Sequence, residues 1–398
     1  MKSIIVPNQY GFMSGRSTSL NLLKFQNDVL EAFSCGYQVD CIYLDFSKAF
    51  DRVDHQILIH KLWRYGVQGK MLDWFNDYLS ERVNFVKVKN CVSKQFETIS
   101  GVPQGSHLGP FLFLLFINDV GDALRDVNYL LFADDLKVYR IIKDASDSSE
   151  LQLSLNKLHE WVDTNNLSFN VNKCKFISYH RSRDPFLFDY YLKNARIERI
   201  FSVKDLGVVF KFDMSFNLHY DFIIGKAFKM LGFVFRNTRS FKSAHCLKVL
   251  YCALVRPILE YCAIIWNPYH ATHIKNLERI QNKFVKRLKF RGVYGTEKLE
   301  LLSLESRRRN NYLIFAFKLL NNLVDSSDLL NCFNFYVPPR SLRQPSLFYV
   351  NLSMTDFLKN SPVNRIMEET NKFCALHDCD IFNVDFSNFK LLMFKAST

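Results

Sequence analysis

The order of apolar and polar positions divides the chain into a mixed N-terminal part and a helical part. Strand-like runs, either alternating or continuously apolar, occur at residues 39–44, 84–88, 129–132, 136–139, 167–169, 175–179 and 201–209. Helical periodicity occurs at residues 19–33, 55–65, 70–79, 108–118 and 149–164. Strands and helices mixed in this way predict an α+β domain over residues 1–215.

Helical patterns dominate residues 216–330. The clearest is residues 273–290, which carry an apolar stripe of Ile274, Leu277, Ile280, Phe284 and Leu288. Residues 331–398 contain Pro338-Pro339 and few long periodic runs, so we expect a loosely organised C-terminal extension of unassigned role. The apolar runs at 111–117 and 247–266 are too short or too interrupted by charge to span a bilayer, and we expect no membrane partner.

The positive charge is concentrated in one segment. Of the formal net charge of +13, residues 216–330 carry +11, from 19 Lys and Arg against 8 Asp and Glu. Such an excess is expected where a domain binds a polyanion, although a solvated lysine-rich helix face is the alternative. The predicted nucleic-acid contacts lie on the helix at 273–290 and are Lys275, Arg279, Lys283, Lys286 and Arg287.

Three acids follow predicted strands. The run 129–132 leads to Asp134 and Asp135, and a second strand follows at once, which predicts a hairpin with this pair of acids as its turn. A solvated aspartate turn would look the same. The strand 39–44 ends at Asp45, and a third carboxylate beside the pair could hold two Mg²⁺ ions about 3.5–4 Å apart for in-line displacement at phosphorus. The acids alone fit a polymerase and a two-metal nuclease equally.

An ordered set of segments resembles the reverse transcriptase of non-LTR (LINE-type, jockey-like) retrotransposons. Asp-Phe-Ser-Lys-Ala-Phe-Asp at 45–51 resembles the first palm motif, Gly-Val-Pro-Gln-Gly-Ser at 101–106 the second and Phe-Ala-Asp-Asp at 132–135 the third. Further resemblances are a fourth motif at 170–175, a primer-gripping strand at 203–208, an upstream motif at 10–18 and a downstream stretch at 254–261. Since the upstream motif begins only nine residues after the start, the resemblance is to an N-terminally truncated element.

The resemblance implies a right-hand polymerase palm with partial fingers in residues 1–215 and a helical thumb in residues 216–330. Asp45, Asp134 and Asp135 would be catalytic metal ligands, with the Phe46 carbonyl completing the shell of two Mg²⁺ ions, or Mn²⁺ in their place. Lys173 would act catalytically by protonating or neutralising the departing pyrophosphate, unless it is simply a surface lysine.

Four residues would bind the nucleotide on the same grounds. Phe50 would exclude the ribose 2′-hydroxyl, although a core phenylalanine is its competing explanation. Gln104 and Gly105 would approach the incoming nucleotide, with a turn requirement as the alternative for the glycine. Arg16 would touch the template or the triphosphate.

The function implied is an RNA-directed DNA polymerase that adds deoxynucleoside triphosphates to a DNA primer on an RNA template. Because its product is DNA and no secretory signal opens the chain, we expect an intracellular, nuclear location. A catalytically inactive truncated remnant that binds nucleic acid stays open as the alternative, since the upstream fingers segment is missing. A two-metal nuclease is disfavoured, because Phe50 and the Gln104-Gly105 pair have no obvious use there.

Overall fold

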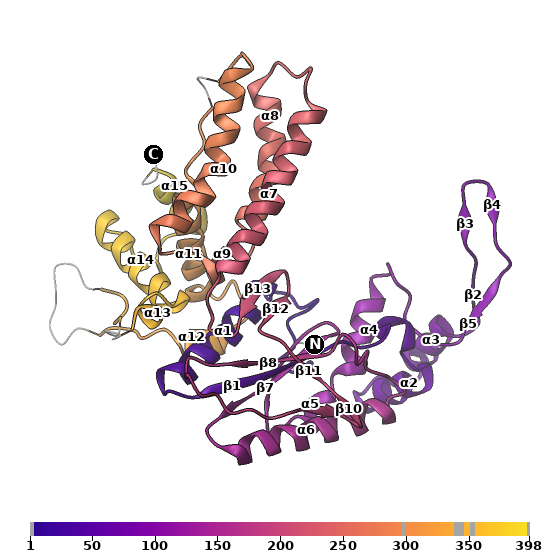
Figure 1. Ribbon diagram of the computed structural model, residues 1–398. Coiled ribbons are helices and arrows are strands. Elements are labelled where there is room, and N and C mark those ends of the chain that lie inside the picture. Colours follow the sequence, from indigo (N-terminus) through magenta and orange to yellow (C-terminus); the bar gives the residue numbers. More distant parts are fainter. Residues whose placement is uncertain (1–3, 297–298, 338–345, 351–354, 396–398) are drawn as a thin grey trace. The chain divides into compact units, whose positions relative to one another are not determined.

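Strand β1 (Gln38–Leu44) lies at the centre of the sheet that carries the candidate carboxylates (Figure 1). The computed structural model describes residues 4–296, 299–337, 346–350 and 355–395. The chain forms two compact units, one of residues 1–17 and 35–201 and the other of residues 18–34 and 202–398. The predicted polymerase domain boundaries at residues 215 and 330 stay a prediction.

In the described part of the first unit, five strands form one sheet in the order β11-β8-β1-β7-β6. Strand β1 pairs antiparallel with both neighbours, so that Leu44 lies opposite Leu136 and Tyr43 lies opposite Lys175. This central place explains why nearly every residue of β1 is buried, Asp40 included, since both faces of the strand are covered. The other strands of this sheet are β6 (Asn128–Phe132), β7 (Asp135–Ile142), β8 (Lys175–Tyr179) and β11 (Glu198–Arg199).

Helices cover the sheet and share one apolar core with it. The core joins Ile42 and Leu44 of β1 to apolar residues of α2, α4 and α6. Helix α2 begins at the side chain of Asp54, which accepts a hydrogen bond from the Ile57 amide at 3.0 Å, and Asp144 caps α6 in the same way. The helices of this unit are η1 (Ala49–Arg52, 3-10), α2 (His55–Arg64), α3 (Lys70–Leu79), α4 (Leu108–Ile117), α5 (Val120–Ala123) and α6 (Ala145–Thr164).

The single strand predicted at 84–88 is wrong. The chain there forms parts of two separate two-stranded sheets, which project from the helices of this unit as a ribbon (Figure 1). Both Phe85 and Val86 are more than half exposed, so no buried face holds the segment in one register. The ribbon strands are β2 (Arg82–Asn84), β3 (Lys87–Val88), β4 (Cys91–Val92) and β5 (Phe96–Thr98), and a further small hairpin is made by β9 (Tyr191–Leu192) and β10 (Ala195–Arg196).

The second unit is mainly helical, as the pattern over 216–330 predicts. The predicted strand at 201–209 is instead a hairpin of β12 (Ser202–Asp205) and β13 (Val208–Lys211), because Leu206 and Gly207 turn the chain with positive φ. The segment at 203–208, which resembles a primer-gripping strand, therefore contains the end of β12, the turn and the first residue of β13. The helices up to residue 330 are α1 (Thr18–Ser34), α7 (Asn217–Asn237), α8 (Ala244–Leu250), η2 (Tyr251–Val255, a π-helix), η3 (Arg256–Leu259, 3-10), α9 (Ala263–Trp266), α10 (Ala271–Phe290), α11 (Leu304–Leu320) and α12 (Ser327–Leu330).

The loosely organised extension predicted beyond residue 331 is also wrong for its described residues. Three helices form there, and α14 packs against α11 by burying Ile366, Met367 and Phe373. These helices are α13 (Asp356–Lys359), α14 (Pro362–His377) and α15 (Phe386–Lys395). The adjacent prolines at 338–339 lie outside the described residues. Among the helices described, none combines the length and apolar character needed to cross a membrane.

Candidate active site

The hairpin between β6 and β7 carries two of the three candidate acids. Its two-residue turn consists of Ala133 and Asp134, because Asp135 already pairs with Phe132 as the first residue of β7. The prediction that Asp134 and Asp135 form the turn is therefore wrong by one residue. Ala133 has a φ of +58°, a conformation that two-residue hairpin turns require and that costs energy for a residue with a side chain.

Asp45 leaves β1 beside this hairpin. The register Leu44 opposite Leu136, continued by one residue, brings Asp45 opposite Asp135. The Asp45 carbonyl accepts a hydrogen bond from the Asn170 amide at 2.8 Å, which joins the segment after β1 to the segment before β8. Through this connection Lys173 lies near the acids, with its Nζ 3.4 Å from Asp45 Oδ2.

The charges of Asp45 and Asp134 act on each other. Burial raises the pKa of Asp134 above its usual value, and the negative charge of Asp45 raises it further. A divalent cation between two such carboxylates would relieve this repulsion.

No three His, Cys, Asp or Glu side chains in the described residues are grouped so that they could hold a metal ion by themselves. Mg²⁺ commonly takes one or two carboxylates and completes its shell with water and substrate phosphates. Asp45 and Asp134 fit that smaller requirement, whereas the structure does not bring all three acids together as a protein-only ligand set.

Phe46 anchors the segment that follows β1. Its ring is 4% exposed and lies 4.8 Å, between centroids, from the ring of Phe169. The Ser47 amide donates to the Ser168 carbonyl at 2.8 Å, so the backbone on both sides of Phe46 is tied to the same neighbouring segment. The main chain that presents the Asp45 carboxylate and the Phe46 carbonyl is therefore fixed.

Phe50 lies in a cluster of aromatic rings. It stacks on Phe113 of α4 with ring centroids 4.2 Å apart, and it meets Phe12 edge-on at 6.3 Å. Because Phe50 is only partly buried, one side of the ring is in contact with the core while the residue still reaches the surface. Both explanations given for Phe50, core packing and contact with a nucleotide, are compatible with this position.

Gln104 and Gly105 lie on an exposed turn before α4. The Gln104 Nε2 donates to Asp51 Oδ1 at 2.7 Å, which links the second motif to the first. Gly105 has a φ of +84°, and a Cβ added there would meet nothing within 4 Å. The backbone conformation by itself accounts for this glycine, and the open space leaves room for a ligand.

The Arg16 side chain contacts neighbouring residues of its own segment. Its guanidinium donates to the Pro7 and Gln9 carbonyls, the latter at 2.8 Å, and lies over the Tyr10 ring. These bonds hold the loop at 7–16 in a compact form.

Gln9 and Gly11 touch the acidic turn, although the sequence assigned neither a role and only Gly11 lies in the upstream motif at 10–18. The Gln9 side chain is bonded to both backbone groups of Ala133, and Gly11 lies against the Phe132–Ala133 peptide. More than 120 positions separate these partners along the chain, so local periodicity and motif spacing contain no sign of the contact.

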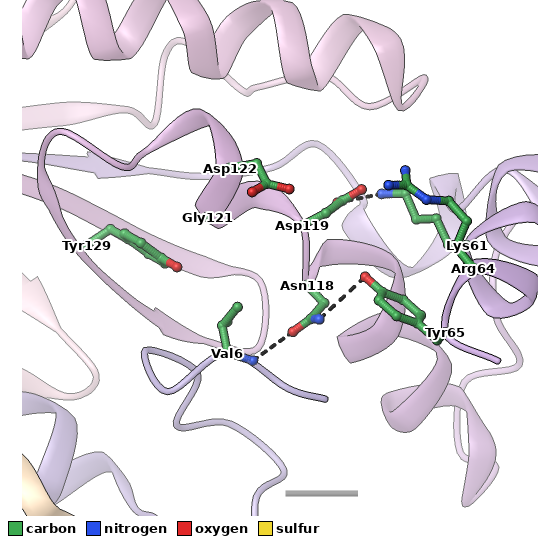
Figure 2. A pocket seen from close by; sticks show the side chains of 9 residues that line it. All are labelled: Val6, Lys61, Arg64, Tyr65, Asn118, Asp119, Gly121, Asp122 and Tyr129. Carbon is green, nitrogen blue, oxygen red and sulfur yellow. Dashed lines mark hydrogen bonds and ion pairs between the residues drawn. The ribbon is translucent and has the colours of Figure 1, made fainter. Parts of the chain in front are cut away.

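Two cavities open in the first unit. One, of about 510 Å³, is mostly apolar and lies beside the second motif, with Phe12, Ser106, His107 and Phe111 in its wall. The other, of about 420 Å³, is shown in Figure 2 and is lined by polar side chains, among them Lys61 and Asn118. Lys61 is buried and bonded to Asp119 at 2.7 Å, and burial lowers its pKa.

The predicted nucleic-acid residues all lie on α10. This helix buries Leu277, Ile280, Phe284 and Leu288, as the stripe predicts, and also Gln281. The five predicted contacts are all exposed and lie away from the buried stripe, which makes a basic face along the helix. That face contains Lys275, Arg279, Lys283, Lys286 and Arg287.

Comparison with known proteins adds an independent finding. The model of the family described as "Reverse transcriptase (RNA-dependent DNA polymerase)" matches residues 1–235. The chain is 26% identical over 300 residues to the probable RNA-directed DNA polymerase from transposon X-element of Drosophila melanogaster, covering 72% of this chain and 32% of that protein. It is 27% identical over 293 residues to the RNA-directed DNA polymerase from mobile element jockey of the same species, covering 70% and 31%.

The chain spans about a third of the length of these curated relatives. Among solved structures, apo telomerase from Candida tropicalis aligns with a TM-score of 0.42 and 12% identity, over 79% of this chain and 50% of that chain.

Proposed function

The chain belongs to the reverse transcriptase (RNA-dependent DNA polymerase) family, and from this premise we propose that it copies RNA into DNA. The resemblance predicted from the ordered motifs is confirmed by the family match and by the relatives from mobile elements. The observation that carries the proposal is the place of the acids: Asp45 follows β1 at the end where the β6–β7 hairpin turns at Asp134, and Lys173 lies 3.4 Å from Asp45.

Asp45 and Asp134, with Asp135 and the Phe46 carbonyl, would hold Mg²⁺ together with the triphosphate of the incoming deoxynucleotide. Mg²⁺ held by these groups would supply Lewis-acid chemistry, which would favour attack of a primer 3′-hydroxyl on the α-phosphate and stabilise the leaving oxygen. The two carboxylates would orient the bound ion and nucleotide, because Asp45 follows the central strand and Asp134 lies in a tight hairpin turn. The ammonium of Lys173, now against Asp45, would neutralise or protonate the pyrophosphate as it departs.

The nucleotide would lie between Phe50 and the turn at Gln104 and Gly105. Phe113 stacks on one side of Phe50, so the ring would obstruct a 2′-hydroxyl instead of moving away. Gly105 leaves the turn open for close approach of the backbone to the ligand. Arg16 would contribute by holding the loop at 7–16, with direct contact to template or triphosphate as the alternative.

The remaining surfaces would bind the template–primer duplex. In this proposal residues 1–215 form palm and partial fingers, residues 216–330 form the thumb, and the basic face of α10 contacts phosphates without reading sequence. The RNA template, the DNA primer and the deoxynucleoside triphosphates are the expected partners, and the nucleus is the expected location because DNA is the product.

A second candidate function is nucleic-acid binding without catalysis. One observation favours it: the described acids do not form a three-ligand metal group without substrate. It predicts salt-sensitive binding to a duplex that is unchanged by Asp134→Asn, whereas the polymerase loses activity in that variant.

The test is primer extension by the purified chain on an RNA template with Mg²⁺, deoxynucleotides and low salt. Template-dependent extension that disappears in Asp134→Asn supports the polymerase. Duplex binding without any extension, at protein excess and with Mn²⁺ also tried, would leave only the binding function.

A further inference from the structure

We propose that Gln9 and Gly11 are positioning residues for the acidic turn, although they lie more than 120 positions before it in the chain. The inference rests on the proposed function, since it concerns the carboxylates of that same site. Neither residue would touch substrate. Both act on Ala133, and through it on Asp134, the next residue in the chain.

The Gln9 carboxamide satisfies both backbone groups of the turn residue. Its Oε1 accepts from the Ala133 amide at 2.9 Å and from the Gly11 amide at 2.8 Å, while its Nε2 donates to the Ala133 carbonyl at 3.3 Å. The side chain is 1% exposed, so water cannot replace these bonds when the amide is removed. One side chain thus supplies the hydrogen bonds that a further strand would give the turn.

The backbone around Gln9 also bonds to β6. We call the contacts of residues 8–11 with β6 and with the turn the clamp. The Tyr10 amide donates to the Leu131 carbonyl and the Leu131 amide donates to the Asn8 carbonyl, both at 2.9 Å, so the segment pairs in parallel with the strand. Gly11 follows at the point of closest approach. A Cβ on Gly11 would overlap the Ala133 amide nitrogen and lie 2.9 Å from the Phe132 carbonyl carbon. Only glycine permits this contact.

The turn needs such support for two reasons. Ala133 holds a positive φ that a residue with a Cβ rarely adopts, so the surrounding bonds must maintain it. Asp134 follows Ala133 directly in the two-residue turn, so any change in the Ala133 backbone would displace the Asp134 carboxylate. Catalytic groups must stay within about 0.5 Å of their productive positions, and a two-residue loop without outside contacts does not provide that.

The decisive variant is Gln9→Leu, which keeps the bulk of the side chain and removes every bond to the turn. Its matched control is Asn118→Leu. Asn118 is also a buried amide that holds the same N-terminal segment, because its Oδ1 accepts from the Val6 amide at 2.8 Å (Figure 2). Its Nδ2 donates to the Ile4 carbonyl at 2.9 Å. It makes none of its described bonds to the turn, so it reports what loosening the segment alone does.

Two readouts separate positioning from general support of the fold. In primer extension at a temperature where all variants are folded, Gln9→Leu should lower kcat about 10- to 100-fold while the KM for deoxynucleotide stays within about twofold. Mn²⁺ binding, followed by electron paramagnetic resonance without substrate, should weaken about 10-fold or more. Asn118→Leu should lower the melting temperature but leave both quantities within about twofold of the wild type.

Gly11→Ala provides an independent check, since it leaves Gln9 intact and forces the Ala133 peptide away. It should reproduce the kcat and Mn²⁺ effects of Gln9→Leu. The corresponding control is Gly121→Ala, where a Cβ would crowd the hydroxyl end of the Tyr129 side chain and no backbone atom of the turn. Equal losses in the Gly11 and Gly121 variants would contradict a specific role at the turn.

The outcomes also separate this inference from the proposed function. If the wild type binds Mn²⁺ but does not extend a primer, and Gln9→Leu alone weakens Mn²⁺ binding, the polymerase proposal fails and the clamp stands. If the wild type is active and Gln9→Leu keeps its kcat and Mn²⁺ affinity, the clamp is overturned and the polymerase stands. A wild-type chain that binds no Mn²⁺ overturns the clamp as well, since no carboxylate pair is then being positioned.

Discussion

We expect the ionised Asp134 carboxylate to lower the free energy of unfolding of the metal-free protein at neutral pH. Its carboxylate is partly buried and faces the negative charge of Asp45, and both effects raise its pKa. The folded protein therefore holds this proton more tightly than the unfolded chain does, and stability is lost as the pH rises through the raised value. Sites that bind a charged ligand are commonly less stable when empty, because the ligand neutralises the charge when it binds.

The first prediction is that Asp134→Asn stabilises the metal-free chain while it abolishes polymerisation. The amide cannot ionise, so the gain should be absent below the ordinary Asp pKa and complete above the raised one. Primer extension should fall at least about 100-fold, because a ligand is lost from the metal that would stabilise the charge on the reacting phosphates. Thermal unfolding in EDTA at several pH values, together with extension rates, measures both effects.

A variant that is less stable than the wild type at pH 7 in EDTA would contradict this account of Asp134. Lys173→Gln is a useful companion, because Lys173 is mostly exposed and its ion pair with Asp45 contributes little to stability. Its melting temperature should stay close to that of the wild type, so any loss of extension rate reports on catalysis.

The second prediction concerns Phe50. Replacing it with Leu should keep the contact with the α4 side of the core but remove the flat ring, and ribonucleotides should then be used about 10-fold better relative to deoxynucleotides. Steady-state incorporation of matched ribo- and deoxynucleotides on one template gives the ratio. An unchanged ratio with a lower melting temperature would mean that Phe50 serves only the core.

At the scale of elements, regular helices were predictable and tight turns inside apolar runs were not. Periodicity alone located α3 and α10 closely, because each buries one continuous stripe. The run at 201–209 looks like one strand since its apolar residues continue past the turn. Gly207, with a φ of +90°, was the only local sign of a reversal, and the non-glycine Leu206 shares the positive φ.

Helix α14 shows a different failure. Ser361 caps it by accepting from the Asn364 amide, and Pro362 follows at the first helical position, so an ordinary start signal was present. The buried apolar positions Val363, Ile366, Met367 and Phe373 also follow helical spacing, so the pattern was present in the sequence and the prediction overlooked it. Their burial depends on α11, about 50 residues earlier in the chain, and only the tertiary structure supplies that partner.

The third prediction tests the basic face of α10. The double variant Lys275→Gln with Lys286→Gln should weaken duplex binding and lower the slope of log affinity against log salt by about 1–2, since each lost phosphate contact removes about 0.7–0.9. The charge-matched control is Lys359→Gln with Lys372→Gln, two exposed lysines on α13 and α14. Fluorescence anisotropy from low to moderate salt gives both slopes. Equal slopes for the two pairs would show that α10 is merely a solvated helix.

At the scale of the whole chain, the ordered motifs predicted the family and the candidate acids, because those residues must keep their spacing for the chemistry. They could not predict what supports the acids. Gln9 reaches Ala133 across 124 positions, and Asn170 bonds the Asp45 backbone across 125, so both contacts exist only after the sheet has formed. The candidate acids were thus visible in the sequence, and the contacts that support their backbone were not.

The fourth prediction uses this difference to decide between a polymerase and a silent nucleic-acid-binding chain. If Asp45 and Asp134 hold divalent metal, Mg²⁺ or Mn²⁺ must stabilise the folded chain by mass action, by about 2.7 kcal/mol at a free concentration 100 times the dissociation constant. The rise in melting temperature should disappear in Asp134→Asn and persist in Lys173→Gln, since only the first removes a ligand. Deoxynucleotide added with Mg²⁺ should raise it further, because its phosphates complete the shell that the protein leaves open. A chain that binds duplex but shows no metal-dependent stabilisation, with or without deoxynucleotide, would be a binding protein that has lost its reaction.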